Sequence, residues 1–215
     1  MDILKRNLAP LTEEAWGEID SRAREVLKNN LSARKVLSVE GPKGWDYTVI
    51  PEGRLENFVE DEVSSATYMV KPLIESRISF TLNRREMDSI SKGVKDADLE
   101  NLEEAVKKSA LFEEEVVYSG YDQGNIKGLE NETSHEAIDL GDNSSAIMGA
   151  ITQGLLTLKD SFAEGPFSLV VGREAWRKIH IEAQGYPLIR RIENLIGGEI
   201  VLSNVVEGAL LLPYN

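Results

Sequence analysis

The sequence predicts an α+β fold, in which helices and strands are mixed without the regular alternation of a doubly wound sheet. Long stretches with apolar residues at every third or fourth position predict helices, and short apolar runs between them predict strands. Gly and Pro end most of these runs, as expected for turns. With 215 residues and 41% hydrophobic content, the chain can bury a core in one elaborated domain or in two.

The first predicted element is an amphipathic helix from about Thr12 to Leu31. Thr12 is a suitable N-cap, and the two glutamates that follow it match the positive end of the helix dipole. One apolar stripe runs along this helix and must be covered. Its members are Trp16, Ile19, Ala23, Val26, Leu27 and Leu31.

The next part of the chain is predicted to be rich in strands. The predicted strands are 36–39, 47–50, 67–70 and 77–82. The last of these alternates most cleanly between polar and apolar residues. The acidic stretch Glu60-Asp61-Glu62 between the second and the third is expected in a loop or a hairpin arm.

The second half is predicted to be more helical. A long helix is expected from Asp98 to about Ser119, with Gly120 as its stop, and another begins at Ser144. The turn-rich segment 120–143 has few apolar residues and is expected on the surface. After it, strands are predicted at 167–171, 199–202 and 209–212, and helices at 174–183 and 187–196.

The charge and composition exclude several classes of protein. The 37 acidic and 24 basic residues give a net charge of -13, which disfavours binding to nucleic acid or to anionic membranes. Without cysteine there are no disulfides, thiol nucleophiles or thiolate metal sites. No apolar run approaches the roughly 20 residues of a membrane span, and no signal-peptide core follows Lys5-Arg6. We therefore expect a cytoplasmic protein.

The sequence offers no recognisable catalytic or metal-binding motif. The two histidines, His135 and His180, lie in no pattern that pairs a base with a nucleophile. The segment 41–45 lacks the spacing of a phosphate loop and is interpreted as a turn. The acidic run Glu113-Glu114-Glu115 is interpreted as solvated charge on a helix. We expect no catalytic residue, no metal and no cofactor.

A more specific pattern opens the chain. It consists of Leu4-Lys5-Arg6, Ala9-Pro10-Leu11-Thr12, Trp16, Glu18-Ile19-Asp20, Arg22-Ala23-Arg24-Glu25, Arg34-Lys35, Val39-Glu40-Gly41-Pro42 and Gly44-Trp45. Further matching segments follow in order and at similar spacing. They include Pro72-Leu73-Ile74-Glu75, Asp98-Leu99-Glu100, Lys127-Gly128-Leu129, Glu164-Gly165-Pro166-Phe167 and Tyr186-Pro187-Leu188. Together these segments resemble the encapsulin shell proteins.

The resemblance implies the fold of tailed-phage major capsid proteins. It assigns an inner amino-terminal helix, an extended loop at about 53–70 and a peripheral domain with its spine helix to residues 1–143. An axial domain is assigned to residues 144–215. Encapsulins continue through several more peripheral strands, which are missing after Asn215. A fragment, a second chain that supplies the remainder and a shortened homologue all stay open.

The function implied by the resemblance is structural. Encapsulin protomers assemble into an icosahedral compartment, and cargo enzymes of the iron-storage or peroxidase type are held inside through a carboxy-terminal targeting peptide. The implied partners are further copies of the chain and the cargo, and no enzymatic activity is expected. The alternatives are a prophage capsid protein of the same fold and a bacteriocin-like or protease-like activity.

The resemblance also implies two functional sites. The candidates for the wall of the cargo-peptide groove are Leu27, Leu31, Arg34 and Val36. For Leu27 and Leu31, sealing the helix against its own core is an equally good interpretation. The candidates for the rim of a five-fold pore are Glu182, Gln184, Gly185 and Tyr186.

Overall fold

The computed structural model describes residues 4–60, 63–181 and 185–213. Its elements are η1 (Arg6–Leu8), α1 (Glu13–Asn30), α2 (Ala33–Val36), β1 (Val49–Glu60), β2 (Val63–Pro72), α3 (Arg84–Ile90), α4 (Glu100–Tyr118), β3 (Gly120–Tyr121), η2 (Asp122–Gly124), β4 (Ile126–Lys127), α5 (Leu129–Glu132), α6 (Ser144–Asp160), β5 (Phe167–Val171), α7 (Arg173–His180), α8 (Leu188–Ile196), β6 (Gly197–Leu202) and β7 (Ala209–Pro213). This mixture confirms the predicted α+β composition. Among the described helices, none combines the length and the apolar character that crossing a membrane would require.

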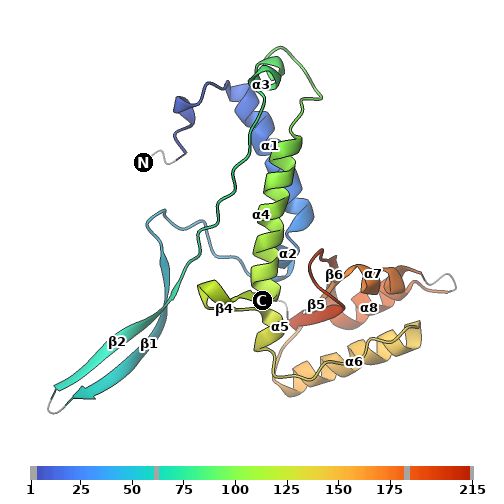
Figure 1. Cartoon of the computed structure of the whole chain (residues 1–215). Coiled ribbons are helices and arrows are strands. Elements are labelled where there is room, and N and C mark those ends of the chain that lie inside the picture. The colour runs from blue at the N-terminus through green and yellow to red at the C-terminus, as the bar shows by residue number, and fades with distance from the viewer. Residues whose placement is uncertain (1–3, 61–62, 182–184, 214–215) are drawn as a thin grey trace.

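The long helices α1 and α4 lie side by side and form the stem of the molecule (Figure 1). The predicted N-cap of α1 is confirmed, because the hydroxyl of Thr12 accepts a hydrogen bond from the Ala15 N–H at 3.2 Å. The stem has its own apolar core, to which α3 also contributes. The core residues are Ala15, Ile19, Met87, Leu99 and Leu102.

Ion pairs flank this stem core. The Arg22 guanidinium lies 2.7 Å from the carboxylate of Glu103 and so links α1 to α4. Before α1, Arg6 contacts both carboxylate oxygens of Asp20 at 2.7 Å and stacks over the Trp16 ring at 4.7 Å. Because these pairs are partly exposed, each stabilises the fold by no more than about 1 kcal/mol. The buried apolar residues therefore contribute more to the association of the two helices.

Strands β1 and β2 form an antiparallel hairpin in which Leu55 pairs with Tyr68 (Figure 1). The predicted strand at 67–70 lies within β2, and that at 47–50 overlaps the start of β1 at Val49. The chain therefore forms the hairpin arm that was one of the two expectations for this region. Of the acidic stretch, positions 61 and 62 lie outside the described residues.

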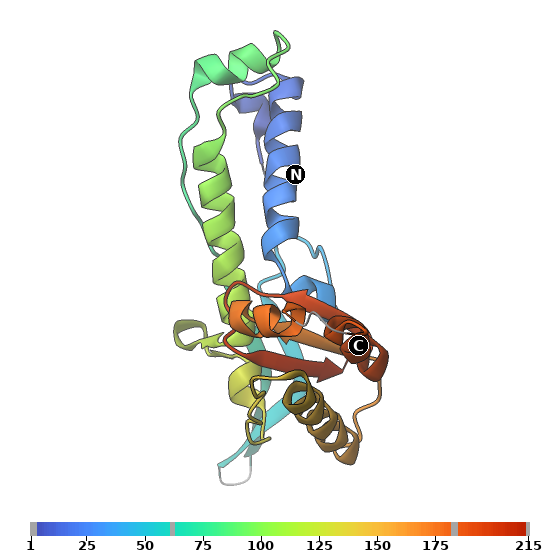
Figure 2. The same cartoon turned by 90° about the vertical axis from the view of Figure 1, so that its right-hand side faces the viewer.

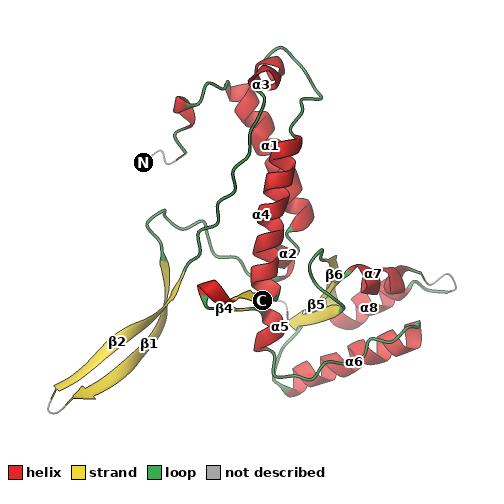
Figure 3. Ribbon diagram, viewed as in Figure 1, coloured by secondary structure: helices red, strands yellow, loops and turns green. Residues whose placement is uncertain are grey.

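Two other predicted strands in this half are wrong. Residues 36–39 are not a strand, because a helical turn, α2, runs to Val36, which is 1% exposed and packs in the core. Residues 77–82 have no regular secondary structure and belong to the long loop between β2 and α3 (Figure 3). Their alternating pattern needs a neighbouring strand, and the described residues supply none. The helix α3, capped by the Asn83 side chain at 2.9 Å, was not predicted.

The second half centres on a three-stranded sheet in the order β6-β5-β7. The central strand β5 is buried along its whole length, pairs parallel with β6 and antiparallel with β7, and confirms the predicted buried strand. Helices α6, α7 and α8 gather around this sheet (Figures 1 and 2). The predicted helices and strands of this half are confirmed at their centres, although α7 ends at His180.

The segment between α4 and α6 is mostly exposed, as predicted, but it contains the short elements β3, β4 and α5. Gly120 ends the long helix with φ +93. A Cβ at this position would lie 2.7 Å from both the Gly128 nitrogen and the Ile126 oxygen. Only glycine therefore fits the turn that brings β3 against β4.

Candidate functional site

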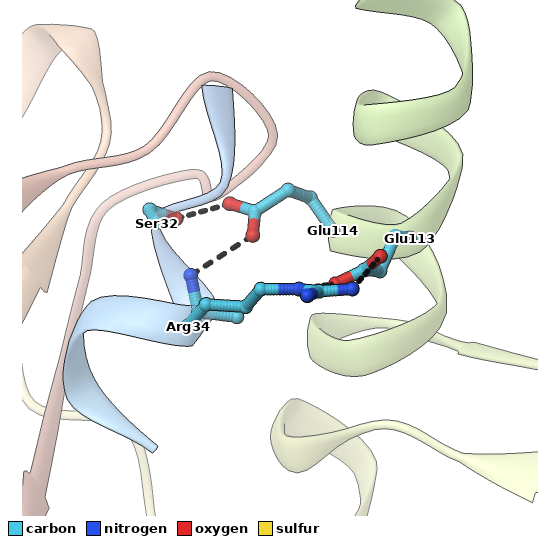
Figure 4. Close-up of polar contacts among 5 residues, drawn as sticks. Ser32, Arg34, Glu113 and Glu114 are labelled. Atoms are coloured by element: carbon cyan, nitrogen blue, oxygen red, sulfur yellow. Dashed lines mark hydrogen bonds and ion pairs between the residues drawn. The ribbon is translucent and has the colours of Figure 1, made fainter. Parts of the chain in front are cut away.

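The end of α1, the helical turn α2 and the long helix α4 meet around one buried carboxylate (Figure 4). Glu114 of α4 is 0% exposed. It accepts a hydrogen bond from the hydroxyl of Ser32 and another, 2.9 Å long, from the backbone N–H of Ala33. Ala33 begins α2, and its N–H has no partner within that helix. A side chain from α4 therefore caps α2.

The hydrogen-bond partners of Ser32 determine which hydroxyl group donates and which accepts in the network around Glu114. The hydroxyl of Ser32 also lies 3.0 Å from the phenolic oxygen of Tyr118. Because the single Ser32 proton is donated to Glu114, Tyr118 must donate to the Ser32 oxygen. Burial raises the pKa of Tyr118 to about 12, and the nearby charge of Glu114 adds to this shift, which exceeds the opposing effect of the Ser32 hydrogen bond. Tyr118 therefore remains a protonated donor at neutral pH.

The neighbouring residue Glu113 also extends from α4 toward α2, but it is partly exposed and meets the side chain of Arg34 (Figure 4). Its two carboxylate oxygens accept hydrogen bonds from Arg34 Nε at 2.5 Å and from Arg34 Nη2 at 2.8 Å. This paired hydrogen bonding to Glu113 raises the pKa of the Arg34 guanidinium. Two adjacent glutamates thus hold both sides of α2, one through the core and one at the surface.

The four predicted residues of the cargo-peptide groove fall into two groups. Leu31 and Val36 are 6% and 1% exposed, so their side chains belong to the interior. Leu27 is half-buried, and the Arg34 side chain is 52% exposed despite its ion pair. In this structure, only Leu27 and Arg34 present appreciable surface to a peptide.

The burial of the apolar stripe of α1 changes along the helix. Near its start, Ile19 is buried and Trp16 is partly buried against the stem core. In its second half, Ala23, Val26 and Leu27 are all half-buried. An incompletely covered apolar strip therefore leads toward α2.

The predicted pore-rim residues lie between α7 and α8, in the other half of the fold. Glu182 and Gln184 lie outside the described residues. Gly185 has φ +93, and the Tyr186 side chain is 61% exposed, with its hydroxyl 3.5 Å from the Asn194 amide nitrogen. The described part of this segment thus presents an aromatic side chain at the surface.

The positions of the two histidines do not favour a hydrolytic site. His135 Nε2 lies 3.5 Å from the Ser161 hydroxyl oxygen, whereas that hydroxyl donates to the Thr157 carbonyl at 3.0 Å. His180 instead packs on the Trp176 ring. Across residues 4–60, 63–181 and 185–213, no group of three or more His, Cys, Asp or Glu side chains is arranged to hold a metal ion.

The sequence interpretation missed the buried centre of this site. The run Glu113-Glu114-Glu115 was interpreted as solvated charge, which is wrong for Glu114. Ala110, Glu114 and Tyr118 are four residues apart and all buried, so they occupy one stripe of α4. That spacing was the available signal, because it places a carboxylate in line with core residues.

Comparison with known proteins gives matches over the whole length of this chain. The chain matches the family Linocin_M18, described as "Encapsulating protein for peroxidase", over residues 1–215. A type 1 encapsulin shell protein of Rhodospirillum rubrum is 33% identical over 225 residues, which cover 100% of this chain and 80% of that protein. A type 1 encapsulin shell protein of Mycobacterium tuberculosis is 32% identical, with 99% of this chain and 81% of that protein covered.

A solved structure shares the fold. The crystal structure of a virus-like particle from Pyrococcus furiosus superimposes with a TM-score of 0.63 and 16% sequence identity, covering 93% of this chain and 79% of that one. The matched family consists of structural shell proteins and not of enzymes. Because the family match extends over the whole chain, this protein belongs to the Linocin_M18 family of encapsulating proteins.

Proposed function

We propose that this chain is the shell protomer of an encapsulin compartment, which assembles into a closed icosahedral particle in the cytoplasm and encloses tagged cargo enzymes. The observation that carries this proposal is the match of 99–100% of this chain to type 1 encapsulin shell proteins at 32–33% identity. A prophage capsid protein would share the fold, but these relatives favour the encapsulin. The cargo is proposed to be of the iron-storage or peroxidase type.

The β1–β2 hairpin supports assembly with other copies. It projects from the stem, and a hairpin of two strands is at best marginally stable alone in water (Figure 1). One face carries the cross-strand pair Leu55 and Tyr68, which are 48% and 77% exposed. Val70 continues this face and is 47% exposed. Such a face is best explained by contact with a neighbouring protomer.

Within this proposal, the parts of the fold take distinct roles. Residues 1–143 form the inner helix, the peripheral domain with its spine α4, and the extended loop at about 53–70. Residues 144–215 form the axial domain, and Gly185 and Tyr186 contribute to its pore rim together with Glu182 and Gln184. The compact sheet with α6, α7 and α8 supports this division, because it has a core of its own.

The cargo peptide is proposed to bind along the half-covered strip of α1. Leu27 and Arg34 would contact it directly, since apolar contacts with a flanking charge suit peptide capture in a groove. Leu31 and Val36, which are buried, would form the floor beneath it. Glu114 binds the backbone at the start of α2 and Glu113 binds the Arg34 guanidinium, so the two glutamates position Arg34 for this role.

Sedimentation velocity of two hairpin variants tests the proposed assembly. Tyr68→Asp places a charge on the apolar face, and we expect it to abolish the fast-sedimenting particle. Ser65→Asp is the matched control, because it adds the same charge to the other face of β2, opposite Phe58. We expect this control to assemble. Equal sedimentation of wild type and both variants as large particles would contradict a role for this face, and equal sedimentation as monomers would contradict the shell function.

A further inference from the structure

A second groove lies between α6, β7 and the segment 129–140. Its volume is about 720 Å³, within the range typical of ligand sites. Its floor is apolar. The floor residues include Ile138, Leu140, Ile151, Leu158, Leu169 and Leu211. Figures 1 and 2 show α6 running beside the sheet that contains β7.

The rim of this groove is acidic. Four carboxylates line it, from Glu130, Glu136, Asp139 and Glu207. Within the part of the chain that the structure describes, none of these four carboxylates forms an ion pair with Lys, Arg or His. Asp139 interacts electrostatically with Lys178, and the other three carboxylates have no such cation among the described residues. A concave apolar surface bordered by carboxylates without ion-pair partners attracts an occupant with Lys or Arg beside apolar side chains.

Strand β7 gives the groove a hydrogen-bonding edge. In the sheet order β6-β5-β7, β7 has a strand neighbour on one side only among the described residues. Its outer edge borders the groove, because Ala209, Leu210, Leu211 and Leu212 all line it. Alternate residues along an edge strand direct N–H and C=O groups outward, and an extended peptide can pair with them.

We propose that this groove binds an extended peptide segment, rich in apolar residues and carrying Lys or Arg, which adds to β7 as a further strand. The apolar floor accepts alternate side chains of the peptide, and the four carboxylates pair with its cations. A second copy of this chain is a poorer match to the rim, since each copy carries a net charge of -13. The proposal is independent of the shell function.

Two pairs of variants test the groove by fluorescence anisotropy, with a short labelled peptide in which Lys and Val alternate as the probe. Gly154→Met fills the groove, because a Cβ at Gly154 already lies 3.4 Å from Leu211 and 3.9 Å from Ile138. Its matched control is Gly149→Met in the same helix, where a Cβ meets nothing within 4 Å. Replacing glycine within a helix also raises helix propensity, so both variants should fold.

The second pair tests the charge of the rim. Glu207→Lys reverses one rim carboxylate, whereas Glu199→Lys makes the same change on β6, at the other edge of the sheet. We expect Gly154→Met and Glu207→Lys to weaken binding at least about tenfold, or about 1.4 kcal/mol, and both controls to bind as the wild type does. Backbone N-methylation of the peptide at alternate residues should abolish binding, because it removes the donors that pair with β7.

Three results would overturn the proposal. Equal binding by all four variants would show that the peptide is attracted only by net charge. Undiminished binding of the N-methylated peptide would exclude strand addition. A loss of self-association in Gly154→Met but not in Gly149→Met, measured by sedimentation, would assign the groove to a second copy of the chain.

Discussion

The side chain of Glu114 links its own helix, α4, to the helical turn α2, although the two elements are far apart in the sequence. Its carboxylate accepts from Ser32 and from the backbone of Ala33, and Ser32 in turn accepts from Tyr118. All of these groups are inaccessible to water, so each depends on its partner in the protein. The position of α2, and with it that of Arg34, therefore depends on Glu114 as well as on the ion pair between Arg34 and Glu113.

Glu114→Ala should lower the free energy of unfolding substantially. The substitution leaves the Ser32 hydroxyl and the Ala33 N–H without an acceptor, and an unsatisfied buried polar group costs about 1–3 kcal/mol. The matched control is Glu115→Ala, because Glu115 is exposed and such changes usually stay within about 0.5 kcal/mol. Urea denaturation followed by circular dichroism measures both. A Glu114→Ala variant as stable as the control would contradict the network.

Tyr118 should make stability fall at alkaline pH. Its pKa is about 12 in the folded chain and about 10 when unfolded, so below pH 10 both states are protonated and the full stability is present. As pH rises from 10 to 12, the unfolded state loses this proton first, and stability should fall by about 1.4 kcal/mol per pH unit. The urea midpoint at pH 9 and at pH 11 measures this loss.

Tyr118→Phe separates this effect from general alkaline denaturation. The variant should lose less stability between pH 9 and pH 11 than the wild type does, because it has no phenol to ionise. Tyr186→Phe is the control, since the Tyr186 side chain is 61% exposed, and it should follow the wild type. Identical pH profiles for all three proteins would show that Tyr118 does not titrate differently in the two states.

At the scale of elements, the hairpin and the stem depend on different surroundings. The stem core is closed within one chain by residues of α1, α3 and α4. The hairpin instead exposes the apolar cross-strand pair Leu55 and Tyr68, at 48% and 77%. We therefore expect the stem to be stable whether or not the chain is assembled. We expect the hairpin to become fully ordered when neighbouring protomers contact it.

Tryptic digestion measures this difference. The hairpin contains no Lys or Arg between Arg54 and Lys71, and the Lys71-Pro72 bond resists trypsin. Cleavage after Arg54 therefore reports on the hairpin, and the next cleavable site is Arg77 in the following loop. The Arg54 site should be cut slowly in assembled wild-type protein and rapidly in the Tyr68→Asp variant. Mass spectrometry of the released peptide gives the two rates. Equally rapid cleavage in assembled wild type would show that neighbouring copies leave the hairpin uncovered.

The elements that the sequence predicted correctly are those whose apolar pattern is matched by a packing partner within the described chain. β5 is buried on both faces, and α1 and α4 cover one another, so their patterns reflect contacts that the fold supplies. The alternation at 77–82 predicted a strand, but pairing is a property of two segments, and the described residues provide only one. Likewise, periodicity located α4, whereas the burial of Glu114 depends on Ser32, which is 82 positions away.

At the scale of the whole molecule, the chain consists of a long two-helix stem, a projecting hairpin and a compact sheet with its helices (Figures 1 and 2). This elongated form leaves extensive surface for neighbouring copies. The family could be predicted from collinear segments along the chain, because these reflect a shared fold. The cargo-groove residues could be placed only partly, since sequence alone does not show that Leu31 and Val36 face inward.

Negative-stain electron microscopy of the purified, untagged chain tests the shell function most directly. We expect uniform, closed and hollow particles, because the exposed face of the hairpin and the matches to encapsulin shell proteins both support assembly into a closed shell. The Tyr68→Asp variant, imaged in parallel, should show none. Wild-type protein that forms only monomers or irregular aggregates would contradict the proposal that this chain is a shell protomer.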